Sequence, residues 1–188
     1  MTELETRLSL RAHAAGMATD EGNSVAAPPA TEEQFAAAEK QSGFPLPEKL
    51  RQMYRQIGNG GWGPGAGLLG LPAPEAGTLK STAGLLPLVD WGGGITSDAD
   101  CTRPEVPIIR RDPNMPKADV GERVPSAMHF DRAAQVKEAC WVECPSLDEW
   151  LEAWADGASL FYRAYDDGTD SEEEDEEEGE EETSSDAL

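Results

Sequence analysis

The side chains that most often carry out catalysis are scarce in this sequence, which contains only two histidines, His13 and His129. Nucleophilic catalysis by a serine or cysteine needs a histidine beside the nucleophile and a carboxylate that orients the ring. The sequence contains no Gly-x-Ser-x-Gly turn of the kind that presents a nucleophilic serine. We therefore expect no enzymatic activity, and we interpret His129 as a partly exposed histidine on a short strand.

Three cysteines raise the alternative of a zinc site. Cys140 and Cys144 are separated by three residues, and Cys101 and His129 could complete the set. Tetrahedral zinc does accept three cysteines and one histidine, but close ligand pairs usually occur twice in such sites. Because the second close pair is missing, we expect no metal and no other cofactor. Cys140 and Cys144 are interpreted as small apolar residues that fill space in a core.

The glycine-rich run over 58–67 is a poor candidate for a phosphate-binding loop. It lacks the Gly-Lys-Ser/Thr ending, and no predicted helix follows it. Carboxylates accumulate further along the chain, in the region of predicted strands, at Asp90, Asp98, Asp100, Glu105 and Asp112. Two of them could serve as a glycosidase pair, although solvated charges at strand ends and in loops are the simpler interpretation.

These carboxylates could also form an acidic face for a basic protein. An exposed tryptophan is a natural interface anchor, and Trp62 lies in a loop-like, glycine-rich context. The sequence therefore predicts five partner-binding residues, namely Trp62, Asp90, Asp98, Asp100 and Glu105.

The formal charge of −22 is concentrated at one end of the chain. Residues 166–188 hold 14 of the 37 acidic residues and none of the 15 Lys and Arg. The other 23 acidic residues face all 15 basic ones, which leaves a net charge of −8 for residues 1–165. Such a chain is unsuited to direct nucleic-acid binding, which depends on clustered Lys and Arg. It suits a basic protein partner, whose approach it would accelerate.

No segment predicts export or membrane insertion. The first residues are charged and contain no apolar run of signal-peptide length, and no stretch approaches the roughly 20 apolar residues of a membrane span. Three cysteines do not predict a disulfide framework. We therefore expect a cytoplasmic protein with reduced thiols.

Composition divides the 188 residues into three segments. Residues 1–30 are predicted to be a flexible leader, because a short helical pattern gives way to Gly, Ser, Asn and the pair Pro28-Pro29. Residues 31–165 contain the apolar residues of one domain. Residues 166–188 are predicted to be a disordered acidic tail, since they cannot bury enough apolar surface to offset chain entropy.

The predicted domain contains three helices. Thr31 and Gln34 form a capping box at the start of a helix that ends at Gly43. A second helix follows Pro47 and ends at Asn59-Gly60-Gly61, and its apolar stripe consists of Leu50, Met53, Tyr54 and Ile57. A third helix is capped by Ser146 and Glu149 and ends at Gly157; its apolar face consists of Leu147, Trp150, Leu151 and Trp154.

Between the second and third helices the sequence predicts strands. The candidates are 68–71, 85–91, 95–100 and 106–111, with a further short strand over 127–130. Gly92-Gly93-Gly94 predicts a turn between two of them. Two helices, a run of strands and a closing helix, without βαβ alternation, predict an α+β domain. We expect a mainly antiparallel sheet flanked by helices.

Four segments in this order resemble the SUKH superfamily, which includes fungal cell-wall-synthesis regulators and bacterial toxin-immunity proteins. The first is Leu46-Pro47, a helix, and then Asn59-Gly60-Gly61. The others are a strand that ends in Trp91-Gly92-Gly93-Gly94, the strand and turn over 107–114, and the helix containing Trp150, Leu151 and Trp154. Together they span about residues 31–162. The resemblance implies an α+β fold in which these motif residues are structural.

The resemblance also implies a function. It suggests a non-catalytic immunity protein of a toxin–immunity or polymorphic toxin system, which neutralises a basic, nuclease-type toxin by direct binding. The alternative is a regulatory or scaffold protein of the fungal cell-wall-regulator type, which has no toxin partner. A toxin gene beside this one would distinguish the two.

Overall fold

The computed structural model describes residues 2–22, 24–74, 84–113 and 139–164. Within these residues, helices pack around a four-stranded antiparallel sheet whose strand order is β1-β2-β3-β4. The strands are β1 (Leu85–Gly92), β2 (Ile95–Asp100), β3 (Ile108–Asp112) and β4 (Ala139–Cys144). The predicted α+β class with a mainly antiparallel sheet is therefore confirmed.

The β1–β2 hairpin follows from the three glycines that were predicted to form a turn. Gly92, Gly93 and Gly94 have φ angles of 83°, 61° and 87°, which side chains with a Cβ rarely adopt. The pairing of β1 with β2 shifts register between Pro87 and Val89. This irregularity places the consecutive residues Leu88 and Val89 in the same core.

The three predicted helices are present, although α3 ends at Gln56, before the predicted end at Asn59-Gly60-Gly61. Helix α2 (Glu32–Ser42) begins with the capping box of Thr31 and Gln34 and ends at Gly43, which is left-handed. Helix α3 (Glu48–Gln56) begins after Pro47. Helix α6 (Leu147–Ala155) begins at Ser146, whose hydroxyl accepts a hydrogen bond from the backbone N–H of Glu149.

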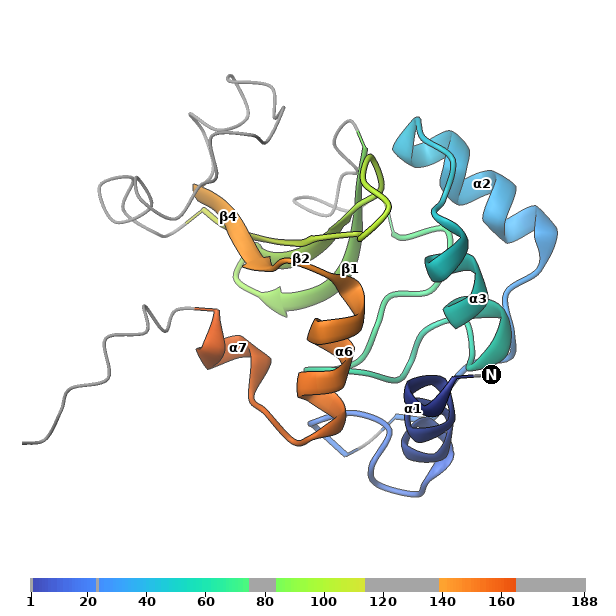
Figure 1. The fold of residues 1–188 in the computed structure, drawn as a ribbon, viewed down its shortest axis with the longest axis vertical. Coiled ribbons are helices and arrows are strands. Elements are labelled where there is room, and N and C mark those ends of the chain that lie inside the picture. Colours follow the sequence, from blue (N-terminus) through green and yellow to red (C-terminus); the bar gives the residue numbers. More distant parts are fainter. Residues whose placement is uncertain (1, 23, 75–83, 114–138, 165–188) are drawn as a thin grey trace, which may run out of the picture.

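The helices and the sheet share one large core. Helices α6 and α7 (Leu160–Arg163) lie on one side of the sheet, and α2 and α3 lie beyond its β1 edge (Figure 1). Ile108 and Ile109 are adjacent on β3 and point to opposite faces of the sheet. Ile108 belongs to the large core, whereas Ile109 packs with Leu85 in a smaller second cluster.

The amino-terminal segment differs from the predicted flexible leader. Residues Glu3–His13 form helix α1, which packs against α6, and its residues Leu8 and Ala12 are buried. The segment after it is bound by backbone hydrogen bonds: the N–H of Ala27 donates to Gly60 O at 3.0 Å, and the N–H of Asn59 donates to Pro28 O at 3.0 Å. The linker-like composition of this segment did not predict these hydrogen bonds, because their partners, Gly60 and Asn59, follow α3 and are far away in the sequence.

Three further elements differ from the sequence prediction. Residues 68–71 are not a strand, although Leu69 donates one backbone hydrogen bond to Leu88 O at 2.8 Å. Strand β4 and helix α7 were not predicted. The predicted strand over 127–130, with His129, and the predicted acidic tail over 166–188 lie outside the described residues.

Candidate functional site

Trp62, the predicted interface anchor, lies in the core. Its side chain is fully buried, its Nε1 donates to Gly58 O at 3.1 Å, and its ring centroid lies 6.1 Å from that of Trp154. The prediction of a partner-binding Trp62 is therefore wrong. The glycines around it allow the backbone to pack closely around the buried indole ring. The sequence alone does not distinguish this arrangement from an exposed glycine-rich loop.

The predicted acidic face is also divided by the fold. Asp98 is buried and forms an ion pair with Arg111 on the neighbouring strand. Asp100 is 5 % exposed and lies 3.5 Å from the guanidinium of Arg103. Two of the four carboxylates predicted to bind a partner therefore serve the sheet and its following turn.

The remaining two predicted carboxylates are exposed but do not lie together. Asp90 pairs with Thr96 next to the β1–β2 hairpin, whereas Glu105 follows the opposite end of β2. The backbone oxygen of Glu105 accepts a hydrogen bond from Leu147 at the start of α6. The four carboxylates that were predicted to bind a partner therefore do not form one continuous acidic surface.

The Asn59-Gly60-Gly61 segment has a structural role. The Asn59 side chain donates to Leu71 O at 3.1 Å and accepts from the Leu71 N–H at 2.7 Å, so that it holds the loop entering the sheet. A Cβ on Gly60 would lie 2.6 Å from Leu68 O, and one on Gly61 would lie 2.7 Å from Val25 O. Three segments of the chain lie so close together here that a Cβ at position 60 or 61 would require the backbone to move.

Two of the motif tryptophans, Trp91 and Trp150, belong to a network around a buried ion pair. Glu143 on β4 lies 3.1 Å from Arg110 Nε and accepts hydrogen bonds from Trp150 Nε1 and Ser97 Oγ, both at 2.6 Å. Ser97 Oγ in turn accepts from Trp91 Nε1 at 2.8 Å. This network joins all four strands to α6, so these side chains are structural in this fold.

The other motif residues lie at the ends of secondary-structure elements or in the hydrophobic core. Leu46 is buried and its N–H donates to Glu39 Oε1 at 3.0 Å, while Pro47 is the N-cap residue of α3. Leu151 and Trp154 are buried on α6. Gly92 and Gly94 belong to the hairpin described above.

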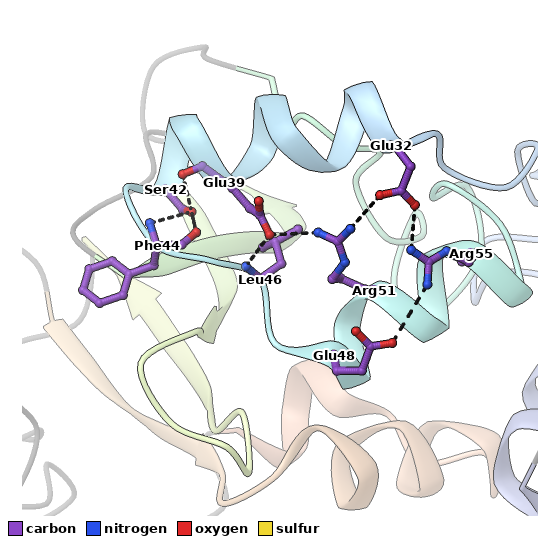
Figure 2. A network of polar contacts seen from close by, with 8 residues as sticks. All are labelled: Glu32, Glu39, Ser42, Phe44, Leu46, Glu48, Arg51 and Arg55. Carbon is purple, nitrogen blue, oxygen red and sulfur yellow. Dashed lines mark hydrogen bonds and ion pairs between the residues drawn. The ribbon is translucent and has the colours of Figure 1, made fainter.

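A network of ion pairs joins α2 and α3 on the surface (Figure 2). Arg51 bridges Glu32 at 2.8 Å and Glu39 at 2.9 Å, and Arg55 reaches Glu32 at 2.7 Å. Both guanidinium groups also lie over the ring of Phe35, at 4.6 and 5.2 Å. The arginines of this face are thereby engaged with the carboxylates of their own domain.

A groove of about 440 Å³ lies between α1, α3 and α6. Its apolar walls come from all three helices and consist of Leu4, Leu8, Met53, Ile57, Leu147 and Leu151. Its charged margin consists of Glu5, Glu48, Lys49 and Asp148. Lys49 Nζ lies 2.7 Å from Asp148 Oδ2, which links α3 to α6 at this margin. We call this feature the helical groove.

Carboxylates extend from the helical groove along the exposed side of α6. Asp148, Glu149, Glu152 and Asp156 are exposed there. Arg7 on α1 pairs with Asp156 and lies 3.8 Å from Glu152, and Lys49 pairs with Asp148. Four carboxylates thus meet two cations, and the helical side of the domain carries the acidic surface that the strands were predicted to form.

Comparison with protein families assigns the fold. A model of the SMI1/KNR4 family (SUKH-1) matches residues 29–113. Residues 29–113 therefore form a segment of the SUKH type. No curated protein and no solved structure matches the chain significantly.

The SUKH match covers α2, α3 and the strands β1 to β3, but it includes neither α1 nor α6. Two of the three walls of the helical groove therefore come from segments outside the matched residues. Among the residues that the structure describes, no three His, Cys, Asp or Glu side chains are grouped so that they could hold a metal ion. None of the described helices is long and apolar enough to cross a membrane.

Proposed function

We propose that this SUKH protein is a non-catalytic binding module that acts as an immunity protein and neutralises a basic, nuclease-type toxin by direct contact. The observation that carries the proposal is the acidic exposed surface of α6, which borders the helical groove in a member of a family associated with protein binding. We further propose that it acts in the cytoplasm.

The mechanism is occupation of the toxin's substrate surface. A nuclease holds its substrate through clustered Lys and Arg, since phosphate contacts dominate nucleic-acid affinity. An acidic protein that covers those residues excludes the substrate without any chemistry of its own. The net charge of −22 would accelerate the encounter through long-range attraction.

A second candidate is a regulatory or scaffold protein of the fungal cell-wall-regulator type. The matching family model, that of SMI1/KNR4, favours it. The two candidates differ in one requirement, because only an immunity protein needs a toxic partner encoded in the same or a competing cell.

The test is a functional pairing. The full chain is used to capture proteins from its native host, and each captured basic protein is then expressed alone and together with the chain. An immunity protein restores growth that the captured protein alone inhibits. If the specific partners are not toxic when expressed alone, the immunity role is contradicted and the scaffold role is favoured.

Association kinetics test the electrostatic part of the mechanism. Deleting residues 166–188 removes 14 carboxylates, so association should slow and become less salt-dependent, while dissociation stays nearly unchanged. Screening acts over about 8 Å at physiological ionic strength. Loss of all binding on deletion would instead identify this segment as the recognition element.

A further inference from the structure

We infer that the helical groove receives the apolar side chains of a basic amphipathic helix supplied by the partner. The inference rests on the proposed function as a protein-binding module, and it specifies the surface and the partner chemistry. The partner helix would present apolar residues at positions i, i+3, i+4 and i+7, the arrangement that docks into grooves between helices.

The walls of the helical groove carry the first part of the argument. Leu4 and Leu8 come from α1, Met53 from α3, Ile57 from the C-cap of α3, and Leu147 and Leu151 from α6. These residues line a volume of about 440 Å³ from three directions. All of them except Leu4 are 4 % exposed or less, so they form the floor of the groove. This volume lies within the range of protein pockets that bind ligands, and such a concave apolar surface gains from the removal of its water.

The charges at the margin select the occupant. Glu5, Glu48 and Asp148 outnumber the single cation Lys49, which is already bound to Asp148 at 2.7 Å. The nearest partner of Glu48 is Arg55, at 3.9 Å, and this arginine is held more closely by Glu32 at 2.7 Å. Lysines and arginines flanking the apolar stripe of a docked helix would therefore meet carboxylates.

The same charges argue against a second copy of this chain as the occupant. The chain carries a formal charge of −22, and its exposed α6 surface is acidic. Placing two such surfaces together would oppose like charges, which disfavours association. An acidic partner helix is disfavoured for the same reason.

The experiment uses three synthetic peptides of about 20 residues, long enough to form helix in isolation. The first has leucines at i, i+3, i+4 and i+7 and a mixture of alanines and lysines elsewhere, because lysines alone would repel one another along the helix; the second has the same composition in scrambled order; the third replaces each lysine by glutamate. Binding to the full chain is followed through ¹³C-methyl signals of Met53, Ile57 and Leu151. The amphipathic and the scrambled lysine peptides have the same charge and are attracted equally by the acidic segment 166–188. A difference between their affinities therefore reports binding at the helical groove.

Two pairs of variants localise the binding. Gln52 is exposed and lines the groove, whereas Gln56 is exposed on the same helix and does not. Gln52→Phe should weaken binding of the amphipathic lysine peptide tenfold or more, and Gln56→Phe should leave it within about twofold. Glu48→Lys should weaken it several-fold, whereas Glu33→Lys, an equal charge change in the first turn of α2, should not.

The inference is supported if the amphipathic lysine peptide alone shifts the groove methyl signals and Gln52→Phe blocks it. It is overturned if the scrambled peptide binds equally, if the glutamate peptide binds as well, or if Gln52→Phe binds like the wild type. A captured basic partner that still binds the Gln52→Phe variant would overturn the groove assignment and leave the proposed function intact. Absence of any basic partner would contradict the proposed function instead.

Discussion

The guanidinium of Arg11 lies over the indole ring of Trp154, 4.0 Å from its centroid. The same side chain donates a hydrogen bond to Ala155 O at 3.2 Å. On the same tryptophan, Nε1 donates to Asp20 Oδ1 at 2.9 Å. The segment that precedes the SUKH match thus holds helix α6 in place, and through α6 it shapes the helical groove.

Replacement of Arg11 tests whether this segment is part of the domain. Arg11→Ala should lower the free energy of unfolding by about 2 kcal/mol, because it removes a partly buried cation–π contact and hydrogen bonds from a charged donor. Leu10→Ala is the control, since Leu10 is 70 % exposed on the same helix. Urea denaturation measures both. Identical midpoints for Arg11→Ala and the wild type would mean that α1 is not docked.

Trp154 should be a large contributor to stability. Its side chain is fully buried and packs against Trp62. Trp154→Ala should destabilise the fold by about 3–5 kcal/mol, as should Trp150→Ala, because each leaves a cavity in the core. Tyr162→Ala should have little effect, since Tyr162 is 74 % exposed. Thermal unfolding distinguishes these outcomes, and an unchanged melting temperature for Trp154→Ala would contradict the assigned apolar face.

Gly61 and Gly43 form a matched pair, because both have a φ angle of 74°. A Cβ on Gly43 meets nothing within 4 Å, whereas one on Gly61 would lie 2.7 Å from Val25 O. Gly43→Ala should cost about 1 kcal/mol from backbone strain alone. Gly61→Ala should cost about 1–3 kcal/mol more, because the backbone must also move. Equal losses in urea denaturation would show that no close approach exists at Gly61.

The buried pair of Arg110 and Glu143 gives a prediction about coupling. Both side chains are 3 % exposed or less. Glu143→Ala should destabilise the fold by about 3–5 kcal/mol, because a buried guanidinium loses its counter-charge. The double variant with Arg110→Met and Glu143→Leu should be less destabilised than Glu143→Ala. At the exposed pair of Lys49 and Asp148, Asp148→Ala should change stability by about 1 kcal/mol or less. A double variant at least as destabilised as Glu143→Ala would argue against the pair.

Cys101 predicts how stability depends on alkaline pH. Burial, together with the charges of Asp100 and Asp98, raises the pKa of the Cys101 thiol from 9.0 to about 12. A pKa that is higher in the folded state means that the protonated thiol contributes stability below pH 9. This contribution falls as the pH rises between about 9 and 12.

The corresponding variant is Cys101→Ala, compared with the wild type by urea denaturation at about pH 8 and about pH 10.5. The wild type should lose more stability over this interval than the variant does. Burial raises the pKa of Tyr54, and the charge of Cys101 raises it further, so the difference between the two proteins includes the coupling of Cys101 to Tyr54. Parallel losses would show that the Cys101 thiol is not held in its protonated form.

Local interactions explain which parts of the fold could be predicted. The capping box of Thr31 and Gln34, the left-handed Gly43 and the Gly92–Gly94 turn all depend on residues within a few positions of one another. Their side-chain and backbone preferences therefore act before any tertiary contact forms. For the same reason the sequence predicted α2, α3, α6 and the β1–β2 hairpin, and with them the fold class.

The features that the sequence did not predict depend on contacts between residues that are far apart in the chain. Glu143 and Arg110 come together only when β4 pairs with β3, and Trp62 is buried in a core to which α6 contributes Trp154. A carboxylate such as Asp98 is equally compatible with an exposed face and a buried ion pair until Arg111 is placed beside it. The sequence alone thus determined that this is an acidic α+β chain with SUKH motifs. The tertiary structure decided which carboxylates remain on the surface and where the groove between them lies, because burial is set by contacts between elements far apart in the chain.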